Sequence, residues 1–378
     1  MKIAVLTSGG VDSSVALRLL KDEGHEVTAF YLKIWLEDEL QYLGECPWEE
    51  DLAYVRQICE EINVPLEIVP MQKEYWDRVV AYTVAEAKAG RTPNPDILCN
   101  QQIKFGQFYE KIDASFEKVA TGHYAQIAEI SSEERGAKSV ELLNAHRSPL
   151  TAYRYVLKMA PDPIKDQTYF LAQLSQKQLS RALFPIGKYT KEEVRQLAEN
   201  YDLPNKNRKD SQGICFLGKI PFREFLKHHL EEKPGDFIEL ETGKKIGRHL
   251  GFWFYTIGQR QGLGLSGGPW FVVKKNVERN IVYLANGYEP QEVYKSEFDI
   301  GPMHLINPES STFNLHSSIK VKIRHGAAMH DCQLQGDRVI LKEPVHGVAA
   351  GQFAVFYELD PRGGGDVCFG SAMILEGL

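Results

Sequence analysis

Apolar positions in the first 125 residues alternate between short continuous runs and stretches with helical spacing. The short runs predict strands at 2–6, 26–32, 66–69 and 118–120. Between them, apolar residues recur every three or four positions, which predicts helices at 13–23, 49–62 and 75–89. Strands separated by helices of this length are typical of an α/β fold with a doubly wound, mostly parallel sheet. Such sheets bind ligands at the carboxyl ends of their strands, and the first such end is the loop at 8–14.

In the rest of the chain the pattern of apolar and polar residues changes twice. Residues 126–162 are interpreted as an inserted hairpin, and helices are expected at 167–183 and 191–201, the second opened by a capping box of Thr190 and Glu193. After about residue 217 glycine becomes frequent and long helices stop. Short alternating strands predict a small closed C-terminal β-barrel, with strands at 318–323, 332–334, 338–341, 352–358 and 370–375.

These patterns predict three domains. A catalytic domain would occupy 1–217, a small mixed connecting domain 218–290, and a barrel 291–378. The 378 residues are 43% hydrophobic and 25% charged, which is the profile of a globular protein with sizeable cores. No apolar run of about 18 residues is present, so no membrane span is expected. The first strand starts at the N-terminus and leaves no room for a targeting peptide, so we expect a cytoplasmic protein, or an organellar one if a transit peptide was removed.

The net charge of −7 alone argues against a nucleic-acid partner, but binding depends on local patches. Acidic residues are dense at 37–61. Basic residues gather elsewhere, at 206–209, 244–245, 274–275 and 320–324. A polyanion could therefore bind on one face.

Six cysteines are spread along the chain without a CxxC pair: Cys46, Cys59, Cys99, Cys215, Cys332 and Cys368. A disulfide framework is not expected in a chain this long without a secretion signal. A structural zinc site is not expected either, because close ligand pairs are missing. The pattern favours one or two reactive thiols among inert buried ones, in a reducing compartment.

The motif with the clearest chemistry is Ser8-Gly9-Gly10-Val11-Asp12-Ser13-Ser14, between a strand and a helix. The glycines let the backbone approach a ligand, the first amides of the helix point at one anion, and the serines offer hydroxyl donors. The motif has no lysine, so it is not the loop that transfers a γ-phosphate, and chemistry at the α-phosphorus is favoured. Asp12 would hold Mg²⁺ or cap the helix. The structural alternative is an ordinary Ser/Gly turn.

Two further loops carry cysteines. Residues 92–100, TPNPDILCN, combine two stiffening prolines with polar side chains suited to reading a base edge, and the alternative is a rigid turn with a buried cysteine. Residues 210–216, DSQGICF, follow the basic run at 206–209, whose charge would lower the pKa of the Cys215 thiol. The alternative there is a cysteine in a core strand.

The glycine-serine loop resembles the PP-loop of N-type ATP pyrophosphatases, which adenylate a carbonyl or carboxylate and release pyrophosphate. Together with the two cysteine loops, ATGHYA at 120–125 and KDQTYFL at 165–171, it resembles the tRNA-specific 2-thiouridylases over essentially the whole chain. That resemblance implies ATP-dependent 2-thiolation of the wobble uridine of tRNA, through adenylation of the C2 oxygen and sulfur transfer from a cysteine persulfide. The segment at 126–162 of this chain looks longer than the corresponding segment in the family pattern.

The resemblance also implies roles for individual residues. Cys215 would carry the persulfide, Cys99 would form a disulfide with it or assist sulfide release, and Asp96 would act as general acid/base beside a flipped base. ATP, with Mg²⁺, would be bound by residues at three strand ends: Leu6, Thr7, Ser8, Gly9, Gly10, Val11, Asp12, Ser13, Leu32 and Gly122.

The tRNA anticodon loop would be bound by Asn94, Pro95, Asp96, His123, Lys165, Asp166, Gln167, Arg324, His325 and Gln352. Three of these have structural alternatives: His123 as a histidine satisfied by backbone, Asp166 as a helix N-cap and Arg324 as a solvated strand residue. A cysteine desulfurase or a sulfur-relay protein would supply the sulfur.

Two rival functions are weaker. Another PP-loop ligase acting on a small molecule, such as an amidotransferase, would need an ammonia source, and no glutaminase signature is visible. A non-catalytic RNA-binding protein would not need an intact ATP loop.

Overall fold

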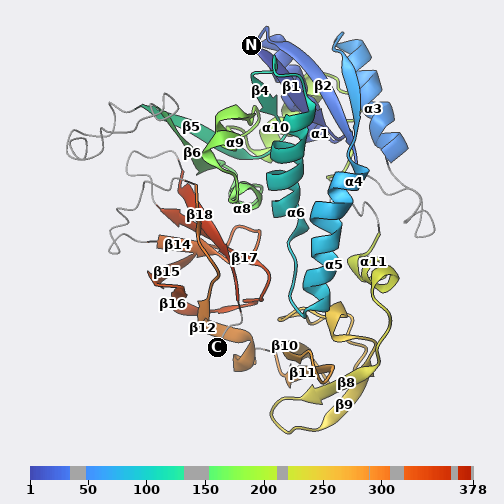
Figure 1. The fold of residues 1–378 in the computed structure, drawn as a ribbon, viewed down its shortest axis with the longest axis vertical. Coiled ribbons are helices and arrows are strands. Elements are labelled where there is room, and N and C mark those ends of the chain that lie inside the picture. The colour runs from blue at the N-terminus through green and yellow to red at the C-terminus, as the bar shows by residue number, and fades with distance from the viewer. Residues whose placement is uncertain are drawn as a thin grey trace, which may run out of the picture.

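The protein is described by a computed structural model, which covers residues 1–34, 48–131, 153–210, 220–288, 290–306, 319–358 and 365–375. It contains a parallel sheet, a small mixed sheet and a large antiparallel sheet (Figure 1). The α/β class with a mixed module and a C-terminal β-domain is therefore confirmed.

The parallel sheet has the strand order β3-β2-β1-β4-β7. Its strands are β1 (Lys2–Thr7), β2 (Glu26–Lys33), β3 (Leu66–Pro70), β4 (Lys118–Ala120) and β7 (Ala182–Leu183). Alternate residues of β1 pack on opposite faces. Ile3 and Val5 contact a core built with α1 (Val11–Asp22) and α3 (Trp48–Glu61), while Ala4 and Leu6 contact a core on the other face. Helices on both faces make the sheet doubly wound, as predicted.

The predicted helix at 75–89 and the helix after the second motif are both continuous rods with π-helical turns in them. The first consists of α4 (Gln72–Tyr75), η2 (Trp76–Val80) and α5 (Ala81–Lys88). The second consists of α6 (Pro95–Leu98), η3 (Cys99–Gln107) and α7 (Phe108–Lys111). The first rod runs from the parallel sheet toward the small mixed sheet, and the second runs back toward the parallel sheet (Figure 1). One core joins Tyr75 and Val79 to Phe252 and Trp270, so the rods hold the two sheets together.

The helix predicted at 167–183 is wrong as a single element. The chain forms α8 (Thr168–Leu171), then α9 (Gln176–Arg181), and then β7. Ser175 starts the second helix through a capping box with Gln178, which breaks the rod. Leu183 then pairs with Ala120 in the parallel sheet, and this long-range pairing overrides local helix propensity. The helix at 191–201 is confirmed as α10 (Lys191–Asn200), with its predicted capping box.

The small mixed sheet has the order β10-β11-β8-β9. It follows α11 (Phe222–His229) and contains β8 (Gly235–Glu239), β9 (Lys245–His249), η6 (Phe252–Phe254), β10 (Trp270–Asn276) and β11 (Ile281–Asn286). A short turn, η7 (Gln291–Val293), leads on to the C-terminal strands.

The antiparallel sheet has the order β12-β16-β15-β14-β17-β18-β6-β5, with β13 also pairing with β18. Its C-terminal strands are β12 (Tyr294–Asp299), β13 (His304–Leu305), β14 (Ile319–Lys322), β15 (His330–Gln335), β16 (Arg338–His346), β17 (Phe353–Glu358) and β18 (Val367–Met373). The hairpin predicted at 126–162 is confirmed as β5 (Ala125–Ser131) and β6 (Tyr153–Met159). Cys368 pairs with Leu157, so this hairpin extends the C-terminal sheet.

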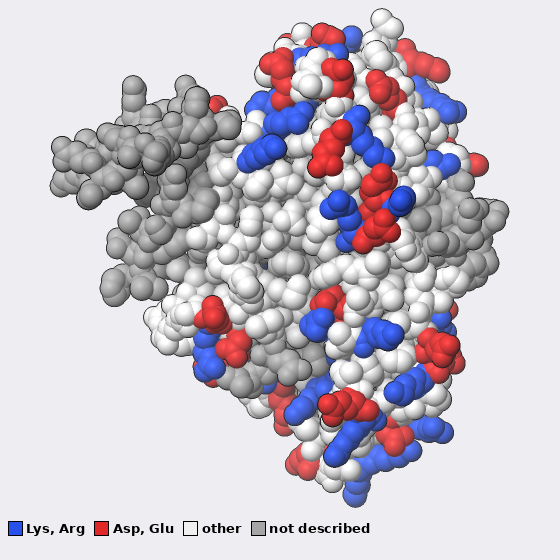
Figure 2. Space-filling view, in the orientation of Figure 1, with Lys and Arg blue, Asp and Glu red and all other residues white. Residues whose placement is uncertain are grey.

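The predicted basic runs are only partly exposed. Within 320–324, Lys322 is fully buried, and within 244–245, Lys245 pairs with Asp236 at 2.6 Å. On the face drawn in Figure 2, basic and acidic side chains are interspersed. Runs of like charge in the sequence therefore do not form patches of like charge on that face. Among the described residues, no helix has the length and apolar character needed to cross a bilayer.

Candidate nucleotide and tRNA site

The glycine-serine loop connects the carboxyl end of β1 to the first turn of α1. Gly10 is the N-cap of α1, and in the described part of the chain no side chain caps that helix. The first-turn N–H groups therefore face a ligand position rather than a capping oxygen. Gly9 has φ +73°, and a Cβ there would lie 2.5 Å from the carbonyl oxygen of Asp51 on α3. Both the conformation and the close approach require glycine, and the loop suits an anion such as phosphate.

The serine hydroxyls of the loop act mainly within the loop itself. Ser13 Oγ and Ser14 Oγ each donate to the carbonyl oxygen of Gly10 at 3.0 Å. Ser13 Oγ also accepts from the backbone N–H of Ser8 at 3.2 Å. Ser13 and Ser14 thus shape the loop, and their contacts with a ligand stay a prediction.

Gly122 brings the end of β4 directly against this loop. A Cβ on Gly122 would lie 2.7 Å from the backbone nitrogen of Ser13 and 2.8 Å from the carbonyl carbon of Asp12. Strand β1 lies between β2 and β4, so the chain winds in opposite directions on its two sides. Leu32, near the end of β2, is partly buried against two cores. The predicted ATP residues thus come from the ends of three adjacent strands.

Asp12 is held by two side chains that sequence reasoning missed. Its Oδ1 accepts from Lys191 Nζ at 2.7 Å and from the Tyr124 hydroxyl at 2.8 Å. Because the N-cap is Gly10, the capping role considered for Asp12 is wrong. The signal for Lys191 was present in the sequence, since it lies within the capping box of Thr190 and Glu193 that fixes the start of α10, but its partner is 179 positions away.

Asp210 connects Asp12, through Lys191, to further cations. Its carboxylate contacts Lys191 Nζ at 2.8 Å, Lys165 Nζ at 2.6 Å and Arg195 Nη2 at 2.5 Å. Burial acts to raise the pKa of Asp210, but the hydrogen bonds from Lys165 and Lys191 outweigh it and hold that pKa well below its ordinary value. Lys165, predicted to contact tRNA, is thus linked to Asp12 of the nucleotide loop through Asp210 and Lys191.

The basic run at 206–209 is largely neutralised. Lys206 pairs with Asp202 at 2.6 Å, and Arg208 binds Asp51 and donates to the carbonyl oxygen of Gly9 at 3.0 Å. These two cations stabilise local structure, and the predicted effect of the run on the Cys215 thiol stays a prediction. Cys215 itself and residues 211–219 lie outside the described residues, so the persulfide role stays a prediction.

The second motif forms the start of α6 and contacts the C-terminal sheet. Asn94 is the N-cap and accepts from the N–H of Ile97 at 3.3 Å, while Pro95 occupies the first turn. Asn94 Nδ2 donates to Gln352 Oε1 at 3.2 Å. A Cβ on Gly351 would lie 2.8 Å from Cβ of Arg91, so this barrel loop packs tightly on the motif. Two of the predicted tRNA-binding residues, far apart in sequence, therefore meet.

Cys99 lies one helical turn after Asp96 and is 2% exposed. Burial raises the pKa of its thiol, although Lys104 opposes this shift. In the described part of the chain, Cys99 is a free thiol, as are Cys59, Cys332 and Cys368. A thiol in this environment stays protonated at neutral pH and is a poor nucleophile by itself.

Several predicted tRNA residues have side chains turned inward, and Asn94 and Pro95 of the second motif are buried as well. His123 is 8% exposed, its Nδ1 lies 2.7 Å from Thr121 Oγ1, and burial holds its pKa well below the ordinary value. Asp166 is 1% exposed and pairs with Lys322 Nζ at 2.8 Å. Gln167 Oε1 accepts from the N–H of Tyr124 at 3.0 Å. Gln167, not Asp166, is the N-cap of α8, so the capping alternative for Asp166 is wrong.

The barrel residues Arg324 and His325 are both exposed. The His325 ring stacks on Phe170, with ring centroids 4.5 Å apart and an interplanar angle of 25°. Phe170 belongs to α8, directly after the residues predicted to bind tRNA. The pair therefore forms an aromatic surface between the catalytic domain and the barrel.

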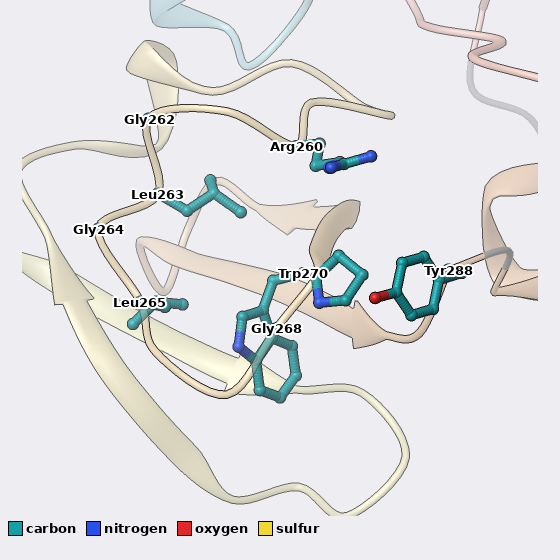
Figure 3. A pocket seen from close by; sticks show the side chains of 9 residues that line it. Arg260, Gly262, Leu263, Gly264, Leu265, Gly268, Trp270 and Tyr288 are labelled. Atoms are coloured by element: carbon teal, nitrogen blue, oxygen red, sulfur yellow. The ribbon is translucent and has the colours of Figure 1, made fainter.

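A separate open hollow lies on the central domain, between Arg260, Trp270 and Tyr288 (Figure 3). Tyr288 is 84% exposed at its rim. None of its lining residues belongs to the predicted site. Among the residues with described structure, no group of three or more His, Cys, Asp or Glu side chains is arranged to hold a metal ion. Mg²⁺ is commonly bound by one or two carboxylates plus substrate phosphates, and Asp12 is the side chain here that fits that pattern.

A parallel sheet of this order, with an uncapped glycine-serine loop at its switch point, defines a nucleotide-binding α/β domain. Family models match three consecutive segments: a tRNA methyl transferase HUP domain at 1–219, a tRNA methyl transferase PRC-barrel domain at 223–286 and an aminomethyltransferase beta-barrel domain at 295–374. The chain belongs to the tRNA-specific 2-thiouridylase family.

Its relatives match from end to end. The tRNA-specific 2-thiouridylase MnmA of Parabacteroides distasonis is 44% identical over 381 residues, covering 100% of this chain and 99% of the relative. MnmA of Porphyromonas gingivalis is 44% identical with 100% of both chains covered. MnmA 2 of Bacteroides fragilis is 45% identical, covering 99% of this chain and 100% of its own.

Proposed function

We propose that this chain thiolates C2 of the wobble uridine of tRNA in a reaction that consumes ATP. The observation that carries the proposal is the uncapped start of α1 behind Gly9 and Gly10, closed on one side by Gly122. This anion site lies in a chain related along its whole length to tRNA-specific 2-thiouridylases.

The first step uses the nucleotide loop. ATP would be bound by Leu6–Ser13 with Leu32 and Gly122. The C2 oxygen of uridine attacks the α-phosphorus and displaces pyrophosphate, which converts a poor leaving group into AMP. First-turn amides and the positive end of α1 stabilise the phosphate charge. Mg²⁺, held by Asp12, would neutralise the departing pyrophosphate.

The second step uses the cysteines. The terminal sulfur of a Cys215 persulfide attacks C2 and AMP leaves, which joins the base to Cys215 through a disulfide. Cys99 then attacks Cys215 Sγ, forming a disulfide between the two cysteines and releasing 2-thiouridine, or it assists release of sulfide before the attack. Asp96, one turn from Cys99, would move protons at the base. Since the buried Cys99 thiol has a raised pKa, it needs a base such as Asp96 nearby to react.

The tRNA surface would combine Asn94, Pro95 and Asp96 with the barrel residues Arg324, His325 and Gln352. His123, Lys165, Asp166 and Gln167 would support it from beneath. The contacts between Asn94 and Gln352 and between Phe170 and His325 support a shared surface for one flipped base. A cysteine desulfurase or a sulfur-relay protein would load Cys215 in a reducing compartment such as the cytoplasm.

The proposal is tested with transcribed tRNA, ATP and a chemical persulfide donor, with 2-thiouridine measured by mass spectrometry of digested RNA. The wild-type protein should form 2-thiouridine and AMP in equal amounts. Cys215→Ser should abolish thiolation while pyrophosphate release continues. Asp12→Ala should lower pyrophosphate release and leave tRNA binding intact. If Cys215→Ser thiolates at the wild-type rate, the sulfur-carrier role is wrong.

A further inference from the structure

The nucleotide loop has no cation of its own for a triphosphate. Its seven residues, Ser8–Ser14, contain one acid and no lysine or arginine. Two of its hydroxyls are committed to the carbonyl oxygen of Gly10. The helix terminus offers amides and a partial positive charge, which is far less than the charge of bound pyrophosphate. Apart from the Mg²⁺ that Asp12 would hold, any cation for the phosphates must therefore come from outside the loop.

We propose that Lys191 is the phosphate-facing cation of this site, and that Asp210 is its positioning residue. Lys191 Nζ lies 2.7 Å from Asp12 Oδ1 and 2.8 Å from Asp210 Oδ1. Asp12 is the second residue of α1, so the ammonium group lies beside the helix terminus that would bind phosphate. The side chain of Lys191 is 14% exposed, and its charge is less screened there than on the surface.

Lys191 can exchange its contacts with Asp12 and Asp210 for contacts with phosphate, and each carboxylate then still has another hydrogen-bond donor. Asp210 keeps Lys165 at 2.6 Å and Arg195 at 2.5 Å when Lys191 turns away. Asp12 keeps the Tyr124 hydroxyl at 2.8 Å. Asp12 and Asp210 therefore both hold Lys191 at the loop, and each has at least one other hydrogen-bond donor.

Among the described residues, Arg208 also contacts the loop, but it has a different role. Its guanidinium binds the carbonyl oxygen of Gly9 and the carboxylate of Asp51, so it ties the loop to α3. It acts on the carbonyl side of the backbone, whereas an anion would contact the amides. Lys191 is thus better placed for phosphate than Arg208.

The inference rests on the proposed use of ATP, and it predicts which part of ATP Lys191 recognises. A cation facing the β- and γ-phosphates should stabilise ATP and pyrophosphate but contribute little to AMP. A purely structural ion pair would affect all three ligands alike, because it would act through the shape of the loop.

The test is calorimetric titration of the full chain with ATP, AMP and inorganic pyrophosphate, without tRNA or a sulfur donor. The variants are Lys191→Met, Lys191→Arg and Asp210→Asn, with Lys188→Met as the matched control, since Lys188 is an exposed neighbour. Lys191→Met should weaken ATP and pyrophosphate binding about 10- to 100-fold, the span of one charge-assisted hydrogen bond, and AMP less than threefold. Lys191→Arg should restore most of the preference for ATP over AMP.

Asp210→Asn should reduce that preference by a smaller factor, because Asp12 still holds Lys191. Equal weakening of ATP and AMP in Lys191→Met, or no weakening of either, would overturn the inference. Should Lys191→Met fail to fold, a full loss of the ATP preference in the folded Lys191→Arg variant would overturn it too. Because the titration needs no thiolation, a protein that does not thiolate tRNA can still confirm or refute the role of Lys191.

Discussion

The side-chain amide of Gln352 joins the loop before β17 to the loop before α6, across 258 positions of sequence from Asn94. Its Oε1 accepts from Asn94 Nδ2 at 3.2 Å, and its Nε2 donates to the carbonyl oxygens of Thr92 at 3.2 Å and Pro93 at 3.0 Å. One side chain from the C-terminal sheet thus fixes the backbone that carries Asp96.

Gln352→Ala should lower kcat/KM for tRNA thiolation about tenfold or more, since it removes three hydrogen bonds that orient the loop at 92–95. Gln352→Glu should be at least as harmful, because a carboxylate cannot donate to the two carbonyl oxygens. ATP binding should stay unchanged in both variants. Gln333→Ala, an exposed change on β15, is the control, and equal activity in all four proteins would refute the positioning role.

Gly122→Ala should weaken ATP binding by at least tenfold, since the new Cβ would lie 2.7 Å from the backbone nitrogen of Ser13 and push the loop away from its ligand. Gly24→Ala is a matched control, because Gly24 has φ +81° but no neighbour within 4 Å of its Cβ position. That control should cost only about 1 kcal/mol of folding free energy and leave ATP binding intact. Titration with ATP and chemical unfolding measure the two effects, and wild-type ATP affinity in Gly122→Ala would contradict the tight packing.

The buried pair of Asp166 and Lys322 should be strongly coupled. Both side chains have no exposed surface, and the pair joins the loop before α8 to β14 in the C-terminal sheet. Lys322→Met alone should destabilise the protein by about 3–5 kcal/mol, because it leaves a buried carboxylate without its cation. The double variant with Asp166→Leu should recover part of that loss.

Urea unfolding of the two single variants and the double variant gives the coupling energy. Lys342→Met is the matched control, since Lys342 pairs with Asp331 at 3.7 Å on an exposed surface and should change stability by less than about 0.5 kcal/mol. Additive effects of Asp166→Leu and Lys322→Met would show that the two side chains do not interact.

Lys275 should make the protein more stable at alkaline pH. Burial lowers the pKa of Lys275 to about 8, from 10.5. Between these values the unfolded chain binds more protons than the folded chain, so the free energy of unfolding rises with pH. Below pH 8 Lys275 is protonated in both the folded and the unfolded chain. The free-energy cost of burying its charge is then present in full.

Lys275→Met should therefore raise the thermal midpoint at pH 7.5, and its advantage over the wild type should shrink as pH approaches 10. Lys274→Met, the exposed neighbour on β10, should follow the wild-type curve at every pH. A pH-independent difference between Lys275→Met and the wild type would rule out the titration of Lys275 as its cause.

Much of the nucleotide site was predictable because its signals are local. A glycine-serine loop between a strand and a helix specifies an anion site within seven residues, and the capping box of Thr190 and Glu193 fixes the start of α10. The periodicity of apolar residues also predicted the strands β1 to β4, whose side chains must match the two buried faces of one sheet.

The partners of those local features could not be predicted from periodicity. Leu183 reads as the end of a helix, and it becomes a strand because β4 offers an open edge for parallel pairing. The basic run at 320–324 reads as a surface patch, yet Lys322 is buried because Asp166 arrives from another domain to pair with it. Charge runs describe the chain, whereas burial depends on what packs against it.

By itself, the sequence determined the fold class, the position of the nucleotide loop and, by resemblance, the family. Only the tertiary structure decided which groups surround the nucleotide loop and the motif at 92–100. Lys191 reaches Asp12, and Gln352 reaches Asn94, through hydrogen bonds that act over about 3 Å of space and leave no periodic trace along the chain. Such contacts form where separately predictable elements pack together, so they become visible only once the packing is known.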